Sequence, residues 1–197
     1  MTTYPRADHP IVVELSPGDL RARLYEALGV YVTAMGYPRG TEHHRAPMWT
    51  EHISRPGWRA FGAIAAGSDA DPGTLVAIAY GYHGTAHQWW HQQVLGGMRR
   101  AGWTEQSAKG MLGDYFEVTE LHVHPDAQGH GLGAALLTRL LDGLTERSAL
   151  LSTPEVEREN NRAWRLYRRF GFTDIVRNFT FAGDSRPFAV LGKQLNP

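Results

Sequence analysis

Three glycines open the stretch QGHGLGAALLTRLL, which runs from Gln128 to Leu141 and is otherwise rich in leucine. Gly129, Gly131 and Gly133 are poor helix formers, so placing them at the start of a helix costs stability. The first amides of a helix have no partner within it, and with the helix dipole they attract anions. Glycine lacks the Cβ atom that would hold an anion away, and it permits positive φ. The stretch therefore predicts a site for a phosphate or a pyrophosphate.

The common nucleotide-binding patterns do not fit this loop. A P-loop requires Lys followed by Ser or Thr after its last glycine, whereas Ala134 and Ala135 follow Gly133. A dinucleotide fold requires Gly-x-Gly-x-x-Gly, whereas this loop carries Gly-x-Gly-x-Gly. A glycine turn that packs a helix closely against a strand is the structural alternative, and the loop alone leaves both interpretations open.

A second segment, ENNRAWRLYRRFGF from Glu159 to Phe172, narrows the choice. Together the two segments resemble the GNAT superfamily of acetyl-CoA-dependent N-acetyltransferases. The first pattern of that family, Gln/Arg-x-x-Gly-x-Gly/Ala, is matched by Gln128, Gly131 and Gly133. The second, looser pattern is matched by Asn160, Ala163, Leu166, Tyr167, Gly171 and Phe172. The chain departs from the family at His130, where Arg or Lys is common.

The resemblance implies acetyl-CoA as the co-substrate, with its pyrophosphate on the backbone amides of Gln128–Ala134. Its pantetheine arm would pair like an added strand with the strand that ends at Val123, in a gap that the family opens beside residues 149–154. The residues that the resemblance assigns to co-substrate binding are Leu121, His122, Val123, Gln128, Gly129, His130, Gly131, Leu132, Gly133, Ala134, Asn160, Ala163 and Tyr167. Asn160 could instead cap the helix that follows it.

The implied reaction is direct attack of a primary amine on the thioester. The amine must first lose a proton, because a lysine-like amine has a pKa of about 10.4, and a backbone amide near Val123 could polarise the carbonyl. The leaving thiolate needs a proton, which the resemblance assigns to Tyr167, since a phenol is protonated at neutral pH. Spacing alone favours a core position for Tyr167, on one stripe with Ala163, Leu166 and Phe170.

The base for this reaction is expected on the strand before the glycine loop, where we rank Glu120 ahead of Glu117. In a regular strand the two carboxylates face opposite sides of the sheet, so at most one lines a given site, although a bulge would reset the alternation. Glu117 lies at the spacing from Gln128 that histone-type family members use, whereas Glu120 lies nearer the co-substrate. His122 and His124 share a face with Glu120 and could relay protons through water.

A metal site is not predicted. His83, His87 and His91 recur at intervals of four and could align on a helix. Gly84 interrupts that helix, however, and no carboxylate accompanies the histidines at a matching spacing.

Other clusters keep a structural interpretation beside the functional one. Trp89, Trp90 and Trp103 could wall an acceptor site, since aromatic rings hold cationic amines, or form a satellite core beneath an insertion. The histidines between residues 41 and 54, His52 included, are expected to be solvated. The arginines between Arg158 and Arg169 favour a solvated helix face over a phosphate-binding patch.

Alternating hydrophobic patterns supply the elements that would position these residues. We expect strands near residues 11–15, 58–67, 74–84, 115–123, 149–154, 172–181 and 186–195, and helices near residues 17–35, 46–54, 132–144 and 161–170. Ser16 and Pro17 form a helix start, and residues 68–73 form a turn. The predicted fold is α/β, with a mixed (α+β) GNAT-like sheet of about six to seven strands flanked by helices. It forms a single domain of residues 1–197 with a helical insertion at about 85–113, after the third strand.

Composition limits the classes of function. The 197 residues are 42% hydrophobic and 20% charged, which is typical of a globular chain with a sizeable core. With 20 acidic and 20 basic residues the formal net charge is zero, so neither nucleic acid nor a membrane is a predicted partner. The absence of cysteine excludes disulfides and thiol nucleophiles. Neither a signal peptide nor a membrane span is predicted, so the expected location is the cytoplasm.

The leading functional hypothesis is an N-acetyltransferase that uses acetyl-CoA. Its acceptor would be a small-molecule amine or a peptide N-terminus, entering beside residues 35–54 and the insertion. One alternative keeps the fold but moves another acyl group or acylates a hydroxyl. Another is a non-catalytic acyl-CoA-binding sensor or interaction module. The family resemblance also makes a homodimer a candidate assembly.

Overall fold

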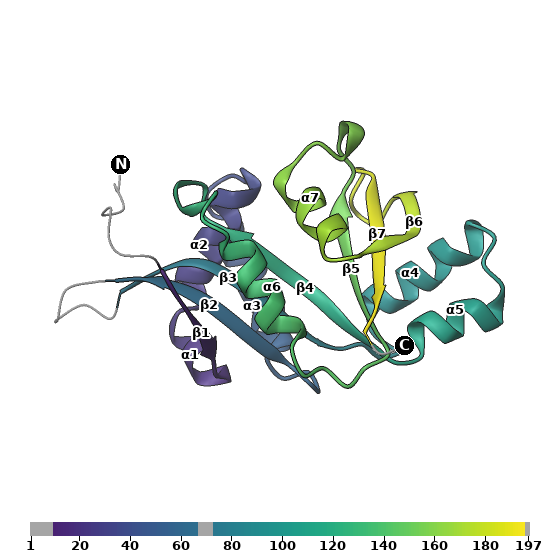
Figure 1. Ribbon diagram of the computed structural model, residues 1–197, viewed down its shortest axis with the longest axis horizontal. Helices are drawn as coiled ribbons and strands as arrows, with labels where there is room; N and C mark the ends of the chain where they lie inside the picture. The colour runs from purple at the N-terminus through teal and green to yellow at the C-terminus, as the bar shows by residue number, and fades with distance from the viewer. Residues whose placement is uncertain (1–9, 67–72, 196–197) are drawn as a thin grey trace. The chain divides into compact units, whose positions relative to one another are not determined.

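The strands of the described chain form one mixed sheet, in the spatial order β1-β2-β3-β4-β5-β7-β6. The computed structural model describes residues 10–66 and 73–195, and Figure 1 shows its elements. The strands are β1 Ile11–Leu15, β2 Arg59–Ala65, β3 Thr74–His83, β4 Tyr115–Val123, β5 Ser148–Pro154, β6 Thr173–Phe179 and β7 Phe188–Gln194. The helices are α1 Pro17–Ala22, α2 Leu24–Met35, α3 Thr41–His52, α4 Trp89–Arg100, α5 Glu105–Leu112, α6 Leu132–Leu141 and α7 Arg162–Arg169. Short 3-10 turns are η1 Pro125–Ala127 and η2 Glu157–Glu159.

Antiparallel pairs dominate this sheet, with β1, β2 and β3 paired in succession and β7 lying between β5 and β6. The one parallel pair described is β4 with β5, and helix α6 lies between them in the chain, as a parallel connection requires. The prediction of a mixed α/β sheet with a helical insertion after the third strand is confirmed. The turn predicted at 68–73 lies outside the described residues, apart from Gly73.

Contacts among the described residues divide the chain into two compact units. The first unit holds the described residues up to Tyr82 together with Glu120–Asp142. The second unit holds His83–Thr119 and the described residues from Gly143 onward. Strand β4 therefore contributes residues to both units. That residues 1–197 form one domain stays a prediction.

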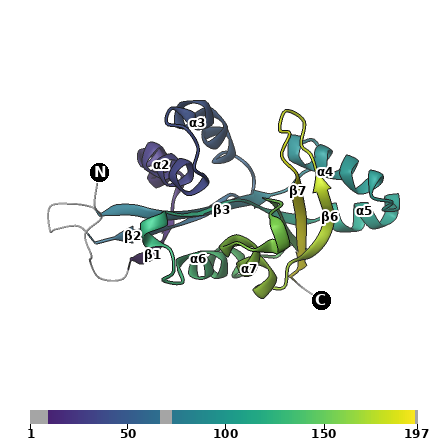
Figure 2. The same ribbon diagram turned by 90° about the horizontal axis from the view of Figure 1, so that it is seen from above.

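In the first unit, helices cover both faces of strands β1 to β3. Helices α2 and α3 lie on one face and α6 lies on the other (Figure 2). Ser16 caps α1 through a capping box, in which its hydroxyl accepts from the Asp19 amide and the Asp19 carboxylate accepts from the Ser16 amide. The core beneath α2 and α3 includes Leu15, Leu20, Leu28, Tyr31, Trp49, Ile78 and Tyr80.

Three expected helix boundaries are wrong. The helix predicted over 17–35 is two helices that meet at Arg23, whose φ of −106° and ψ of 17° are not helical. Helix α3 begins at Thr41, earlier than the predicted 46, because Gly40 in the left-handed region starts it there. Helix α6 ends at Leu141, where Asp142 becomes extended, so Leu144 lies outside the helix.

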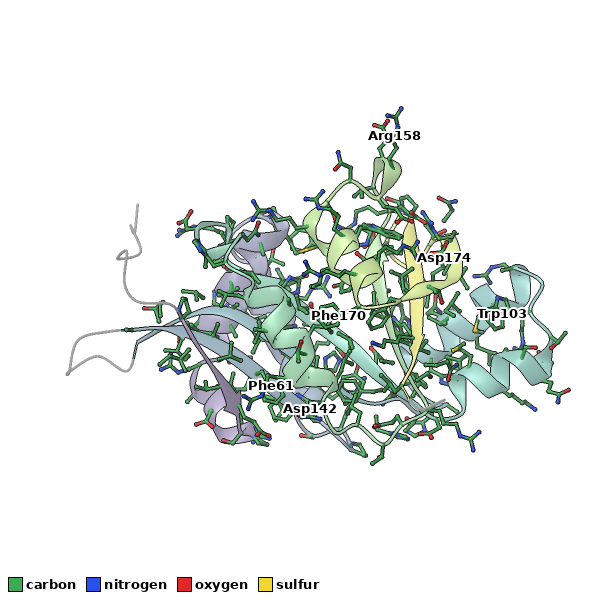
Figure 3. The ribbon with its side chains drawn as sticks, viewed as in Figure 1. Phe61, Trp103, Asp142, Arg158, Phe170 and Asp174 are labelled. Atoms are coloured by element: carbon green, nitrogen blue, oxygen red, sulfur yellow. The ribbon has the colours of Figure 1, made fainter. Side chains whose placement is uncertain are left out.

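In the second unit, the insertion packs as part of the core. Figure 2 shows α4 and α5 on the side of β6 and β7 away from α7. Their shared core consists of Val94, Met98, Ala108 and Leu112 from the helices with Ile175, Val176, Phe179 and Val190 from the strands. Trp103 follows α4 at its C-terminal end (Figure 3) and donates its indole N–H to the Ile175 carbonyl at 3.1 Å.

Two backbone bonds between β3 and β4 indicate a bulge in β4, which the sequence left open. The amide of Gly84, just after β3, donates to the Tyr115 carbonyl at 2.9 Å, and the amide of His124, just after β4, donates to the Val76 carbonyl at 2.8 Å. Residues of a regular strand that bond the same neighbour lie an even number apart. Val76 and Gly84 obey this rule, but Tyr115 and His124 do not, so the extra residue lies in β4. Sequence spacing by itself therefore does not place Glu117 and Glu120 on opposite faces.

Candidate active site

The loop that leaves β4 is held back against the end of that strand. The His124 ring accepts from the Asp126 amide at 3.3 Å and starts η1. The Gln128 side-chain amide then donates to the Val123 carbonyl at 3.0 Å. This bond fixes the start of the glycine stretch close to the last residue of β4.

The three glycines of the loop do not share one backbone conformation. Gly129 and Gly131 have φ of +91° and +78°, a region that side chains with a Cβ rarely adopt. Gly131 is the N-cap of α6 and supplies no side-chain cap, whereas Gly133 lies within the first turn of the helix. A Cβ built on Gly131 would meet nothing within 4 Å. The backbone at this helix start is consequently open to an approaching group.

The amides of Leu132, Gly133 and Ala134 point out of this helix start. The first backbone bond of α6 runs from the Ala135 amide to the Gly131 carbonyl at 3.0 Å. The three preceding amides have no acceptor within the helix. Amides in this position, together with the dipole of α6, suit an anion, and the phosphate site that the sequence predicts stays a prediction. His130 is exposed, and nothing in the structure explains why a histidine stands at this position.

On β4 the structure joins two side chains that the sequence placed on one face. Glu120 Oε2 lies 2.5 Å from His122 Nε2, and the two side chains are 14% and 12% exposed. The Tyr31 ring of α2 meets the His122 ring edge-on, with centroids 5.0 Å apart. Burial, and then the charge of Glu120, raise the pKa of Tyr31 above its ordinary value, so its phenol is neutral at physiological pH.

His52 joins the same region of the first unit, and the expectation that it is solvated is wrong. Its ring is 6% exposed and its Nδ1 lies 3.0 Å from the Tyr80 hydroxyl. Burial, assisted by the charge of Arg55, lowers the pKa of His52 to about 4 against the opposing pull of Glu120. No local pattern predicted that Tyr31 lies against His122. The contact of Tyr80 with His52 was not predicted either, because the two residues are distant in the chain.

The second unit holds the other predicted site residues. Glu117 is 3% exposed, which is far more buried than Glu120. Tyr167 is 7% exposed and its ring meets Phe172 edge-on, with centroids 6.0 Å apart. Half-buried Ala163 lies on the same helix, α7. Tyr167 therefore has the core position that spacing favoured, which is compatible with a further role for its hydroxyl.

Asn160 does not cap α7. The cap is Asn161, whose side-chain oxygen accepts from the Trp164 amide at 2.8 Å. Asn160 is exposed and accepts from Arg165 Nη1 at 3.1 Å. The alternative that assigned the cap to Asn160 is thus wrong by one residue. The side-chain amide of Asn160 is available at the surface.

The described part of β4 that pairs with β5 is short. The pairs run from Tyr115 with Ser148 to Glu117 with Leu150, whereas β4 continues to Val123 and β5 to Pro154. The gap beside β5 that the resemblance implies stays a prediction.

The histidines at intervals of four do not align, because α4 begins only at Trp89. Each ring has its own neighbour: His83 with Glu146, His87 with Thr85 and His91 with Tyr115. Within residues 10–66 and 73–195, no three side chains of the metal-ligating types are grouped to hold a metal ion.

The tryptophans of the insertion take different positions. Trp90 and Trp103 are partly buried against the core of the second unit, as a satellite core requires. Trp89 is 55% exposed and stacks on Phe181 with centroids 5.5 Å apart.

None of the helices described is long and apolar enough to cross a membrane.

Comparisons with known proteins agree with this fold. A family model described as the acetyltransferase (GNAT) family matches residues 42–172. The GCN5-like protein acetyltransferase Rv2170 of Mycobacterium tuberculosis is 51% identical, over 93% of this chain and 97% of that protein. The ribosomal protein bS18-alanine N-acetyltransferase of Escherichia coli is 39% identical, over 35% of this chain and 48% of that protein.

Solved structures share the fold at low sequence identity. NAA60 of Arabidopsis thaliana, in complex with a bisubstrate analogue, matches with a TM-score of 0.60 and 16% identity, over 93% of this chain and 98% of that chain. The ribosomal-protein-S18-alanine N-acetyltransferase of Escherichia coli matches with a TM-score of 0.55 and 20% identity, over 95% and 94%. The protein is an acetyltransferase. More particularly, the chain belongs to the GNAT family.

Proposed function

We propose that this protein transfers the acetyl group of acetyl-CoA to a primary amine of a peptide or a small molecule by direct attack. The observation that carries the proposal is the open start of α6. Gly131 gives the backbone its left-handed turn and leaves space where a Cβ would stand. GNAT acetyltransferases use acetyl-CoA as their co-substrate, and a pyrophosphate suits three unpaired amides at a helix N-terminus.

The remaining residues take roles consistent with this reaction. The pyrophosphate binds the loop Gln128–Ala134, and the pantetheine arm pairs with β4 up to Val123, beyond the last pair with β5. Asn160 contacts the co-substrate with its exposed amide. Tyr167 gives its proton to the thiolate that leaves.

The proton acceptor is proposed on β4, at Glu120 and the side chain it contacts. Glu120 remains partly exposed, whereas the burial of Glu117 to 3% exposure leaves little of that carboxylate for a substrate. Glu120 is therefore favoured over Glu117.

The names of the relatives favour a peptide or protein acceptor. Rv2170 is named as a protein acetyltransferase, and the shorter match is named for an alanine of a ribosomal protein. A further short match, over 30% of this chain, is named a mycothiol acetyltransferase, which keeps a small-molecule acceptor as the second candidate.

Binding of acetyl-CoA tests the co-substrate site. Gly131→Ala should raise the Kd for acetyl-CoA by about tenfold or more, because a Cβ at φ +78° costs about 1–2 kcal/mol and shifts the amides. Calorimetry measures this Kd. Gly143→Ala is the matched control. Gly143 has φ of +68° and equally open space around its Cβ position, and it follows the other end of α6. The control should lose stability but keep its affinity for acetyl-CoA. Failure of the unaltered protein to bind acetyl-CoA overturns the proposal.

Turnover separates the enzyme from a binding module. We expect thiol release from acetyl-CoA with at least one acceptor in a panel of peptides with free N-termini, N-terminally blocked lysine peptides and small aliphatic amines. Tyr167→Phe should lower kcat by about 100-fold or more without changing acetyl-CoA affinity. Tyr25→Phe, at a ring that is 56% exposed, should leave kcat unchanged. Binding without turnover for every acceptor would instead identify a non-catalytic acyl-CoA-binding module. Full turnover by Tyr167→Phe would show that another group protonates the thiolate.

A further inference from the structure

We propose that His122, through its Nδ1 atom, is the general base of this acetyltransferase, and that Glu120 is the residue that positions it. The proposal rests on the proposed function. It moves the proton-accepting atom from the carboxylate, which the strand pattern favoured, to the imidazole that the carboxylate contacts.

The direction of the hydrogen bond assigns the tautomer. An ionised carboxylate can only accept hydrogen bonds, so the 2.5 Å contact between Glu120 Oε2 and His122 Nε2 requires the proton to be on Nε2. A neutral imidazole with its proton on Nε2 carries a lone pair on Nδ1. Within residues 10–66 and 73–195, no side chain or backbone group is hydrogen-bonded to Nδ1 of His122. The structure thus leaves Nδ1 available to take a proton.

The ring of His122 is held in place from two sides. Glu120 bonds one nitrogen, and the Tyr31 ring of α2 packs edge-on against the imidazole at 5.0 Å. A carboxylate that bonds one nitrogen of a histidine fixes its orientation and stabilises the imidazolium that forms when the other nitrogen accepts a proton. Both side chains are nearly but not completely buried, so a substrate can still reach them.

The other groups near the pair do not supply a competing base. Tyr31 keeps its proton because burial raises its pKa, and His52 is buried against Tyr80. His124 uses its Nδ1 to accept from the Asp126 amide. The groups that act on the pair or on its neighbours from the helices and strands around it are Tyr31, Tyr37, Arg45, Arg55, Glu51, His52 and Tyr80.

The step conserves atoms and charge. Nδ1 of His122 takes one proton from the acceptor ammonium and becomes part of an imidazolium paired with Glu120. The freed lone pair forms the new C–N bond, and the C–S bond breaks. The leaving thiolate takes its proton from Tyr167. The nitrogen loses its second proton as the amide forms, and this proton restores the one that Tyr167 gave. A histidine suits this task better than a carboxylate, because its ordinary pKa of about 6.5 lies nearer both neutral pH and the amine.

Nitrogen NMR tests the tautomer without any acceptor. In protein labelled with 15N-histidine, long-range 1H–15N spectra distinguish a protonated Nε2 from a protonated Nδ1, and the His122→Gln variant identifies the signals. We expect the proton of neutral His122 on Nε2. A proton on Nδ1 would overturn the proposal.

Kinetics with the best acceptor of the panel tests the base itself. His122→Gln should lower kcat by about 100-fold or more at neutral pH, with unchanged acetyl-CoA affinity. Glu120→Gln should cause a smaller loss, because glutamine can still accept from Nε2. Its KM for the acceptor should stay at the wild-type value, because Glu120 orients the imidazole and does not itself hold the acceptor.

The matched control is His83→Gln, which breaks another contact of a histidine with a glutamate, His83 with Glu146 at 3.3 Å. This variant should keep the wild-type kcat and pH profile. If Glu120→Gln abolishes turnover and the acidic limb while His122→Gln retains both, Glu120 is the base and the proposal is wrong. Absence of turnover in the unaltered protein would contradict the proposed function and the base with it, whereas turnover that survives His122→Gln contradicts the base alone.

Discussion

His52 illustrates how burial decides the chemistry of one residue. Its neighbours on α3, His43 and His44, are exposed, whereas the His52 ring lies beneath the helix beside Tyr80. Because the folded state holds His52 in its neutral form, with a pKa of about 4, the unfolded chain binds a proton more readily. The contribution of neutral His52 to the free energy of unfolding is therefore fully present above pH 6.5 and is lost as the pH falls towards 4.

This burial predicts a measurable pH dependence. Between pH 7.5 and pH 5, the free energy of unfolding in urea should fall by about 2 kcal/mol more in the wild type than in His52→Gln, which removes the titrating group. His44→Gln, at an exposed position of the same helix, should keep the wild-type dependence. Equal pH dependence in the wild type and His52→Gln would show that His52 is not held neutral.

At the level of residues, the sequence predicted the backbone of the glycine loop, whereas the site residues themselves stay predictions. Gly131 is required by its positive φ, and glycine spacing alone indicated that. It could not distinguish Asn161 from Asn160 as the cap of α7, because two successive asparagines suit the position equally. It also placed His52 in solvent, because a histidine on a polar helix face gives no sign that Tyr80 of a distant strand covers it.

Among the elements, α4 shows two successive glycines with opposite surroundings. A Cβ on Gly97 would lie 2.8 Å from the Phe179 ring, whereas a Cβ on Gly96 would meet the tip of Arg100 at 3.5 Å. Gly97 thus lets α4 approach β6 closely, and Gly96 faces a flexible side chain.

The two glycines should respond oppositely to alanine. Gly96→Ala should raise the free energy of unfolding by up to about 1 kcal/mol, because alanine is the better helix former. Gly97→Ala should lower it by about 1–3 kcal/mol, because its methyl group overpacks Phe179. Urea denaturation of both variants at one pH checks the signs. A stabilised Gly97→Ala variant would mean that α4 does not pack on β6 as described.

The prediction of elements succeeded where hydrophobic periodicity persists and failed at their ends. The leucine stripe indicated α6, yet it extended the helix to Leu144, because hydrophobic spacing continues past the point where Asp142 becomes extended. The stripe from Leu20 to Met35 also concealed the junction at Arg23, since two helices with matching faces give the pattern of one. Helix ends depend on backbone geometry that periodicity does not report.

For the whole chain, alternation and element order predicted a mixed sheet with a helical insertion, and this fold class is confirmed. The order of the strands in space was not predicted. Strand β7 lies between β5 and β6, although it follows both in the chain. The insertion also proved to be part of a core, because Val94 and Met98 pack on strands from the end of the chain. Contacts between residues so far apart in sequence leave no local pattern.

The arginines from Arg158 to Arg177 also make contacts that the sequence pattern did not predict. Most of those in the run 158–169 are exposed, as expected of a solvated face, and Arg158 lies at the tip of the loop before α7 (Figure 3). Arg168, however, pairs with Glu159 and with Asp174, which Figure 3 places on β6. Arg177 pairs with Glu159 and Asp174 as well, and with Glu155 through two bonds of 2.7 Å.

This network of Glu155, Glu159, Arg168, Asp174 and Arg177 constrains how the protein can diverge. Because Glu159 and Asp174 are each shared by both arginines, the effect of replacing one member depends on which others are present. Loss of Arg177 would leave the largely buried carboxylate of Glu155, which is 10% exposed, without its guanidinium partner, and an uncompensated charge of this kind is costly. Substitutions at the five positions should therefore be inherited as a set, with each accepted change altering which changes can follow.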